Sequence, residues 1–357
     1  MSPLLVLRVH SDLRLGLGHV ARALALSEAW RALGGTPLLA ISGDDRARKV
    51  GAGIHPLTGE ALGIECVDLG LSSGAVLPEA IKARAAVVLL DQWDHTQAMI
   101  ESLRPLKVAV MEDDGDAHEG ADLLFQPFLE GLAWPATPLR NEGGRKVKPC
   151  ETRRGGCRVL RGAPYVVVSP AAVKARPKRE PLQPLAVHRL LVTFGGTDGP
   201  GLAQRAFDIL AELLRTGAWS GTCTLLAPNG IQGAPVPGLR VEPSLPDLTG
   251  RISSYDAIWC AAGVTLAEAV CLGVPAAAWA QNERQGAMIS DLAQAGGCFS
   301  LGVGPEADPR GVREALLHWL GPEGQDTRQE QTRDGMVLLD GLGAHRIAQE
   351  LWALAGH

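Results

Sequence analysis

The chain has 357 residues, which exceeds the usual size of a single hydrophobic core, so two domains are expected. Hydrophobic residues make up 46% of it and charged residues 20%, values that exclude a largely disordered chain and a coiled coil. The formal charge of −5 lacks the basic surplus of a nucleic-acid binder, and no apolar run approaches the roughly 18 residues that cross a bilayer.

The seven cysteines are odd in number and scattered, without a C-x-x-C pair or the Cys/His spacing of a metal site. This pattern favours reduced thiols that pack as small hydrophobic side chains. The apolar run 4–9 is too short for the core of a signal peptide, and polar residues follow it at once. We therefore expect a cytoplasmic protein with no integral membrane segment and no nucleic-acid partner.

Short apolar runs alternate with helical stretches along the whole chain. They lie at 4–9, 37–41, 64–69, 85–90, 107–111 and 123–126, and then at 189–194, 223–227, 239–242, 257–261, 276–279 and 298–301. Apolar runs bounded by Gly, Asp or Pro are typical of buried parallel strands. Their alternation with helices predicts two doubly wound α/β domains that face a central cleft, with ligands outside the carboxyl ends of the strands.

Two segments separate the halves of the chain. Residues 130–161 contain turn residues and an excess of Arg and Lys, which predicts a solvated loop. Residues 169–187 contain four prolines and predict an extended linker. The sequence thus predicts an N-terminal domain over 1–168, a linker over 169–187 and a C-terminal domain over 188–357.

A glycine loop follows the first predicted strand. Gly16 and Gly18 would let the backbone approach a ligand. His19 comes next, at the start of an amphipathic helix whose dipole favours a neutral imidazole, which can act as a base near pH 7. Arg22 lies three residues on, on the same helical face. The alternative is that His19 only caps the helix and that Arg22 is solvated.

The same loop also fits the dinucleotide fingerprint G-x-G-x-x-G/A, with Ala21 at its last position. An NAD(P) oxidoreductase is therefore a second hypothesis. Two observations count against it. The six residues 10–15 intervene between the strand and Gly16, and Asp44 falls too late to bind a ribose.

The second half of the chain contains two glycine turns. The first, Gly195-Gly196-Thr197, comes directly after a predicted strand. The second is Gly263, which would let the backbone amides of Val264 and Thr265 point at a diphosphate at a helix N-terminus. Glu268 lies one turn later, within reach of ribose hydroxyls. The alternative is an ordinary helix start with a favourably placed acid.

Acidic residues follow two predicted strands in the first half. Asp91 is placed to orient His19 or bind sugar hydroxyls, or else to cap the next helix. The acids and histidine of 113–118 have no identifiable third metal ligand, so we expect solvated loop acids and no metal site. The sequence contains neither a G-x-S-x-G elbow nor a phosphate-binding P-loop, which argues against an α/β-hydrolase and a P-loop ATPase.

These motifs, in this order, resemble a known family. From Arg8 to about Gly302 the chain is similar to the UDP-2,4-diacetamido-2,4,6-trideoxy-β-L-altropyranose hydrolases of pseudaminic acid biosynthesis, to the spore-coat polysaccharide proteins and to the wider GT-B superfamily of nucleotide-sugar glycosyltransferases. The motifs that carry the resemblance are Gly16-x-Gly18-His19-x-x-Arg22, Asp91-x-Trp93, Glu112-Asp113-Asp114, Ala163-Pro164-Tyr165, Phe194-Gly195-Gly196-Thr197-Asp198, Ala262-Gly263-x-Thr265-x-x-Glu268, Leu272-Gly273-Val274-Pro275, Asn282 and Gln285.

The resemblance implies a GT-B fold whose C-terminal half binds UDP and whose N-terminal half holds the sugar. It implies that His19 is the general base that activates water against the anomeric carbon, with Arg22 and Asp91 beside it. It implies no metal and no cofactor. The residues it assigns to the UDP moiety are Gly263, Val264 and Thr265 for the diphosphate, Glu268 for the ribose and Asn282 near the sugar–phosphate junction, with Gln285 following.

Four positions differ from the family's pattern, namely His10, Trp93, Ser169 and Val264. The differences predict a changed sugar pocket, or transfer to an acceptor other than water. A GT-B glycosyltransferase is therefore the alternative to a hydrolase. A nucleotide-sugar-binding protein without catalytic activity is a further hypothesis.

Overall fold

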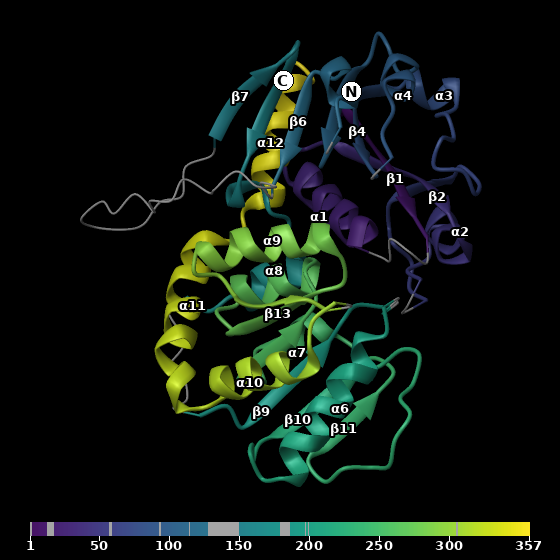
Figure 1. The fold of residues 1–357 in the computed structure, drawn as a ribbon. Coiled ribbons are helices and arrows are strands. Elements are labelled where there is room, and N and C mark those ends of the chain that lie inside the picture. The colour runs from purple at the N-terminus through teal and green to yellow at the C-terminus, as the bar shows by residue number, and fades with distance from the viewer. Residues whose placement is uncertain are drawn as a thin grey trace. The chain divides into compact units, whose positions relative to one another are not determined.

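Two units, each built on one β-sheet, make up the computed structural model of the chain (Figure 1). The structure describes residues 2–12, 18–56, 59–92, 94–113, 115–127, 150–178, 186–196, 198, 200–304 and 306–357. Unit 1 comprises Met1–Phe128, Lys148–Val167 and Leu342–His357, and unit 2 comprises Leu129–Val147 and Val168–Gly341.

The sheet of unit 1 has the strand order β3-β2-β1-β4-β5-β6-β8-β7. All neighbouring strands pair in parallel except β7 and β8, which form an antiparallel hairpin. The strands are β1 (Leu4–Ser11), β2 (Thr36–Gly43), β3 (Glu65–Asp68), β4 (Ala85–Asp91), β5 (Lys107–Met111), β6 (Leu123–Gln126), β7 (Cys150–Arg154) and β8 (Cys157–Arg161). Because the order runs outward in two directions from β1 and β4, the topological switch point lies between these two strands.

Side chains alternate between the two faces of this sheet, and each face has its own buried core. On one face Leu5, Leu7 and Val9 of β1 pack with the cluster that includes Trp30, and on the other Leu4 and Val6 pack with a second cluster. The helices of unit 1 are α1 (Gly18–Ala32), α2 (Asp45–Gly51), α3 (Glu79–Lys82), α4 (Gln97–Glu101) and α12 (Gly343–Leu354), with short 3₁₀ turns η1 (Ala117–Gly120) and η2 (Ala163–Tyr165).

The sheet of unit 2 is fully parallel, with the order β11-β10-β9-β12-β13-β14, so its switch point lies between β9 and β12. Its strands are β9 (Arg189–Thr193), β10 (Thr222–Leu226), β11 (Leu239–Glu242), β12 (Ala257–Cys260), β13 (Ala276–Ala280) and β14 (Phe299–Val303). Its helices are α5 (Pro170–Ala175), α6 (Leu202–Arg215), α7 (Leu248–Ile252), α8 (Val264–Cys271), α9 (Glu283–Gln294), α10 (Pro309–Leu320) and α11 (Gln325–Leu338), with the 3₁₀ turn η3 (Pro322–Gly324).

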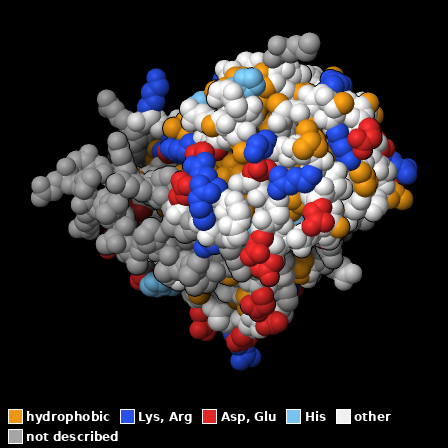
Figure 2. Space-filling model, turned by 90° about the horizontal axis from the view of Figure 1, so that it is seen from above, with side chains coloured by type: hydrophobic (Ala, Val, Ile, Leu, Met, Phe, Trp, Pro, Cys, Tyr) orange, Lys and Arg blue, Asp and Glu red, His pale blue; other side chains and the backbone are white. Residues whose placement is uncertain are grey.

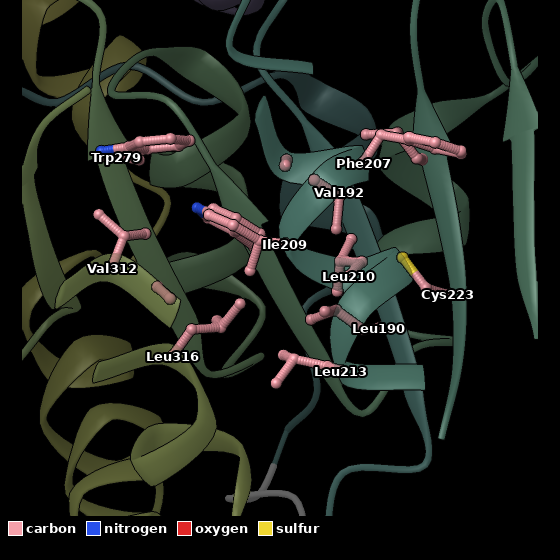
Figure 3. Close-up of a cluster of buried hydrophobic side chains, with 14 of the residues drawn as sticks. Leu190, Val192, Phe207, Ile209, Leu210, Leu213, Cys223, Trp279, Val312 and Leu316 are labelled. Carbon is pink, nitrogen blue, oxygen red and sulfur yellow. The ribbon is translucent and has the colours of Figure 1, made fainter. Parts of the chain in front are cut away.

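A large apolar cluster fills one face of the unit 2 sheet. Figure 3 shows Leu190 and Val192 of β9 beside Leu210 of α6, with Leu316 of α10 in the same layer. Trp279 of β13 is fully buried in this cluster, and its ring centroid lies 5.4 Å from that of Trp259. This packing fixes β9, β12 and β13 relative to α6 and α10, and so fixes the loops that leave the carboxyl ends of these strands.

The predicted fold class is confirmed, because both units are doubly wound α/β domains whose strands pair in parallel apart from the β7–β8 hairpin. Each of the twelve predicted apolar runs forms a strand, with ends that differ by no more than two residues. The predicted solvated loop over 130–161 is wrong in its last part, which forms the hairpin of β7 and β8. Buried Cys157, Val159 and Leu160 alternate there with flanking arginines, and the basic residues obscured this strand pattern. The rest of that prediction, 130–149, lies outside the described residues.

The segment predicted as an extended linker begins with a helix. Ser169 caps α5 by accepting a hydrogen bond from the backbone amide of Ala172 at 3.2 Å. Pro170 stands at the first helical position, where its missing N–H is not needed. A proline there favours a helix start, so the prediction of an extended chain is wrong for Pro170–Ala175.

The last helix departs from the predicted domain boundary, because α12 belongs to unit 1 (Figure 1). The rings of Trp352 and Trp30 meet edge to face, with centroids 4.9 Å apart. Glu350 accepts a hydrogen bond from Arg158 at 2.6 Å. Sequence order alone placed this amphipathic helix with the C-terminal domain, whereas its apolar face completes the core of the first.

The face drawn in Figure 2 carries acidic and basic side chains interspersed, with small hydrophobic areas between them. A mixed surface of this kind fits the balanced composition of the chain. Of the helices that the structure describes, none combines the length and the apolar character needed to cross a membrane.

Candidate functional site

The switch point of unit 1 brings His19 and Asp91 together. The loop after β1 leads into α1, whose second residue is His19, and β4 ends at Asp91. Val9 of β1 and Asp91 are register partners in adjacent parallel strands. His19 and Asp91 therefore meet at the carboxyl edge of the sheet, where ligands bind in open α/β folds.

His19, Asp91 and Arg22 form a buried hydrogen-bonded network. The Nδ1 atom of His19 lies 2.7 Å from Oδ1 of Asp91, and the two residues are 5% and 1% exposed. Arg22 donates from Nε to Oδ2 of Asp91 at 2.8 Å and from Nη2 to Oδ1 at 2.5 Å. Arg22 thus makes a bidentate contact with both oxygens of the Asp91 carboxylate. Oδ1 also contacts Nδ1 of His19, which fixes the orientation of the imidazole ring.

Glu112 is a fourth member of this network, and the sequence analysis gives it no role of its own. Its carboxylate accepts a hydrogen bond from Nη1 of Arg22 at 2.5 Å. Its backbone has a φ of 55°, a left-handed conformation that a residue other than glycine seldom adopts. The sequence does contain a clue to this role, because Glu112 directly follows the strand β5, just as Asp91 ends the strand β4.

Opposite charges dominate the titration behaviour of the network. Burial alone would raise the pKa of Asp91, but the Arg22 guanidinium and His19 together hold it well below its usual range. Burial would likewise lower the pKa of Arg22, and the two carboxylates of Asp91 and Glu112 instead raise it. Asp91 is therefore an anion and Arg22 a cation throughout the neutral range.

The geometry defines what the imidazole can do chemically. An ionised carboxylate can only accept hydrogen bonds, so Nδ1 of His19 is the protonated nitrogen that donates to Asp91. In the neutral ring the lone pair then lies on Nε2, which is the nitrogen able to take a proton. Asp91 also stabilises the imidazolium that forms. Of the loop glycines, Gly18 is the first residue of α1, and Gly16 lies outside the described residues.

The switch point of unit 2 collects the predicted UDP-binding turns. The loop after β9 contains Gly195, in a left-handed conformation with a φ of 90°, followed by Gly196. The loop after β12 leads to Gly263 at the start of α8. These two turns follow the adjacent strands β9 and β12. Thr197 lies outside the described residues.

The N-terminus of α8 carries free donor capacity. Gly263 has a φ of 156°, and no side chain of the described residues caps this helix. By contrast, Asp247, Asn282 and Asp308 cap α7, α9 and α10 with their side chains. Val264 and Thr265 are the first two residues of α8, so their amides are among those that an α-helix leaves without an internal partner. Such a terminus is suited to an anion.

Glu268 has protein partners in this structure. It is 4% exposed, and its Oε2 accepts a hydrogen bond from the hydroxyl of Thr249 at 2.9 Å. Burial raises its pKa, and hydrogen bonds from Ser169 and Thr249 oppose that rise. The Glu268 carboxylate links the starts of α5 and α7 to α8. This structural role is separate from the ribose contact that the sequence predicts.

Asn282 and Gln285 lie at the turn between β13 and α9. Asn282 caps α9 by accepting from the amide of Gln285 at 3.0 Å, and Oε1 of Gln285 accepts from the amide of Gln281 at 2.9 Å. Gln281, which the sequence analysis missed, donates from Nε2 to the carbonyl of Phe194 at 2.6 Å. This bond joins the α9 turn to the glycine turn after β9. Both turns therefore belong to one edge of the unit 2 sheet.

Of the acids after β5, Asp116 is exposed, as predicted, but Asp113 is not solvated. Asp113 and His118 form a buried pair, with Oδ2 and Nδ1 2.8 Å apart and side chains 5% and 2% exposed. Asp114 and Trp93 lie outside the described residues. Within the described part of the chain, no group of three or more His, Cys, Asp and Glu side chains is arranged to hold a metal ion.

The two units together have the GT-B fold, in which two Rossmann-like domains follow one another. Over essentially the whole chain the structure is similar to the glycosyltransferase SnogD from Streptomyces nogalater (TM-score 0.57, 20% identity, 100% of both chains). It is also similar to MurG from Acinetobacter baumannii (TM-score 0.61, 12% identity, 99% of this chain and 100% of that one). A third similar structure is the spinosyn forosaminyltransferase SpnP (TM-score 0.60, 14% identity, 100% of both chains). At these identities the likeness shows the fold alone.

In sequence, the chain is 25% identical over 202 residues to the spore coat polysaccharide biosynthesis protein SpsG of Bacillus subtilis (strain 168). The aligned part is 54% of this chain and 58% of SpsG, so the match spans little more than half of that relative's length. No protein-family profile matches the chain. The similarity to SpsG agrees with the superfamily that the sequence motifs indicate.

Proposed function

We propose that the protein is a nucleotide-sugar hydrolase that cleaves the anomeric C–O bond of a UDP-linked amino sugar and releases UDP and the free sugar. The observation that carries the proposal is the buried His19–Asp91 pair at the carboxyl edge of a GT-B domain, with 2.7 Å between Nδ1 and Oδ1. The name of SpsG and the glycosyltransferase names of the structural neighbours support a role in polysaccharide biosynthesis and a nucleotide-sugar substrate.

In the proposed reaction the residues of unit 1 activate water. The oxygen of water attacks the anomeric carbon while Nε2 of His19 takes its proton. The bond between that carbon and the diphosphate oxygen breaks, and its electron pair leaves with UDP. Asp91 stabilises the imidazolium through Nδ1, and Arg22 keeps Asp91 ionised and in place. Gly16 and Gly18 let the loop approach the sugar.

The residues of unit 2 hold the leaving group in this proposal. The diphosphate binds the amides of Val264 and Thr265 at the start of α8, where Gly263 keeps the approach open. Negative charge that develops on UDP in the transition state is stabilised there by the helix terminus, without a metal. The remaining proposed contacts are Gly195, Gly196 and Thr197 with the phosphates, Glu268 with the ribose, and Asn282 and Gln285 near the sugar–phosphate junction.

The second candidate function is a GT-B glycosyltransferase, in which a hydroxyl or amine acceptor replaces water. It is favoured by the names of the structural neighbours SnogD and SpnP, which are transferases. The same base and the same leaving-group site serve both reactions. The two functions differ only in whether the sugar leaves free.

The test is a screen of UDP-, GDP- and CMP-linked sugars for nucleotide release in the absence of any acceptor. The hydrolase proposal expects equal amounts of UDP and free sugar from a UDP-amino sugar. Release only after an acceptor is added would favour the transferase. Preference for a GDP- or CMP-sugar would contradict the assignment of uridine. Saturable NADH binding that UDP does not displace would overturn the proposal in favour of an oxidoreductase.

Gly263 provides a direct test of the diphosphate site. A Cβ built on Gly263 has no atom within 4 Å, so a methyl group at this position meets open space where the phosphate would approach. We expect Gly263→Ala to weaken UDP binding at least about tenfold, because both steric block and backbone strain act at the terminus. Isothermal titration calorimetry with UDP measures the effect.

Gly217→Ala is the matched control for this substitution. Gly217 is also left-handed, with a φ of 71° and no atom within 4 Å of a built Cβ, but it lies after α6, away from the carboxyl edge of the strands. Gly217→Ala therefore also places a side chain at positive φ, but without the phosphate block. Equal UDP affinity in Gly263→Ala and the wild type would remove the α8 terminus from the site.

A further inference from the structure

A pocket of about 420 Å³ lies in unit 1, away from the His19 network. It opens between the segment before α3 and helix α4, on the face of the sheet opposite α1, since Leu77, Leu90 and Leu103 of its wall belong to the core of that face. This volume lies within the range of small-molecule sites, roughly 300–1,000 Å³. Its lining combines one cation, Arg8, and one acid, Asp94, with apolar side chains that include Leu77, Leu90 and Leu103.

The floor of the pocket holds a buried cation. Arg8 is 1% exposed and donates to the backbone carbonyls of Val9 at 2.6 Å, Ser73 at 2.8 Å and Ala75 at 3.2 Å (from Nη2) and 3.3 Å (from Nε). Among the residues that the structure describes it forms no ion pair. Burial lowers its pKa to about 10, although Asp94 opposes the shift. A buried charge without a paired counter-charge is costly, so an anion in the pocket would be stabilised.

Asp94 supplies only part of that counter-charge, because it attracts Arg8 without forming an ion pair with it. It is exposed at the rim, and its carboxylate accepts a hydrogen bond from the hydroxyl of Ser73. Its charge is therefore screened by solvent, while Arg8 lies at the apolar floor. The pocket thus has a positive interior and a polar rim.

A second buried polar group, Gln92, lies behind the lining and bonds to two of its residues. Gln92 is 0% exposed, and its Nε2 lies 3.3 Å from both the carbonyl of Ser73 and Oδ1 of Asp94. Both partners are acceptors, which fixes the amide nitrogen on that side. Its Oε1 is buried and accepts no hydrogen bond from the described residues.

We propose that this pocket binds a small amphipathic anion, whose carboxylate or phosphate pairs with Arg8 and whose apolar part packs on Leu77, Leu90 and Leu103. The exposed side chain of Val76, 60% accessible at the rim, adds apolar surface for such a ligand. The inference goes beyond the proposed function, because it uses none of the residues assigned to the reaction or to UDP.

Calorimetric titration with octanoate and with octyl phosphate tests the proposal, using 1-octanol and octyltrimethylammonium as neutral and cationic comparators. We expect saturable binding of at least one anion, and binding of 1-octanol that is weaker by roughly 10- to 100-fold, the usual range for a charge-assisted hydrogen bond. The two anions distinguish a carboxylate from a phosphate site. Failure of both anions to bind, or equal affinity for 1-octanol, would overturn the proposal.

Ala98→Phe is the blocking variant, because Ala98 is exposed on α4 and lines the pocket. Gln97→Phe is its matched control, since it adds the same ring at the neighbouring exposed position outside the lining. We expect Ala98→Phe to abolish binding and Gln97→Phe to preserve it. Arg8→Met removes the charge and should weaken binding of the anions but not of 1-octanol. Undiminished binding to Ala98→Phe would show that the anion lies elsewhere.

Discussion

His19→Ala is expected to reduce the rate of nucleotide release by about 10²- to 10⁴-fold, the usual contribution of a general base. UDP binding should change little, because the proposed UDP contacts lie in unit 2. The imidazole is the only part of the network that has both a donor bonded to Asp91 and a second nitrogen able to take a proton. Single-turnover measurement of UDP release separates this chemical step from product release.

Two comparisons make the His19 experiment decisive. His188→Ala removes an exposed histidine of unit 2 and should leave the rate unchanged. Free imidazole added to His19→Ala should restore part of the activity if the lost group is a base, because the deleted side chain leaves a space of its own shape. If His19→Ala released nucleotide at the wild-type rate, His19 would not be the general base, and this would hold for any substrate.

Asp91→Asn should destabilise unit 1 by about 3–5 kcal/mol, the usual cost of breaking a buried ion pair by neutralising one partner. Asp91 is 1% exposed and accepts from both His19 and Arg22. Its neutralisation leaves Arg22, whose side chain is 13% exposed, with Glu112 as its acidic partner among the described residues. Chemical denaturation measures the change. Asp45→Asn is the control, because the Asp45 side chain is 93% exposed and its pair with Arg48 should contribute under about 1 kcal/mol.

The contribution of Asp91 should depend on pH in one direction only. The pKa of Asp91 is lowered in the folded protein. The folded state therefore binds fewer protons than the unfolded state, and the ionised carboxylate stabilises the native state. This stability is fully present above the unfolded pKa of about 3.9 and is lost as the pH falls through the lower, folded pKa. The difference between wild type and Asp91→Asn should therefore shrink below about pH 4. A difference that stays constant into strong acid would contradict the ion-pair interpretation.

Most of the fold could be predicted from the sequence because buried parallel strands are apolar along their whole length. Runs such as 107–111 and 123–126 are more apolar than the segments on either side of them, and both form strands with those bounds. The hairpin of β7 and β8 could not be predicted in the same way. Its strands lie at the edge of the sheet, where arginines alternate with the buried side chains and resemble a solvated loop.

The candidate site was predictable in its parts and less so in its connections. Glycines and His19 after a strand mark the loop in the sequence, and the position of Asp91 at a strand end suggested that it orients His19. The bonds of Arg22 to Asp91 and Glu112, and of Gln281 to Phe194, depend on which strands are neighbours in the sheet. Local sequence carries no such information, since the partners are separated by 69 to 90 residues.

The chain returns to unit 1 at α12, after the long segment Val168–Gly341 of unit 2, which is inserted between Val167 and Leu342. The backbones on either side of the insertion touch: a Cβ built on Gly343 would lie 1.9 Å from the carbonyl oxygen of Val166. The inserted segment therefore leaves unit 1 and returns to it at nearly the same point. A gene that ends before residue 342 would remove the Trp352 contact with Trp30, whereas splicing 167 directly to 342 would keep it. For expression of the separate halves, the main segment of unit 2, Val168–Gly341, is continuous in sequence, whereas unit 1 requires a deletion within the reading frame.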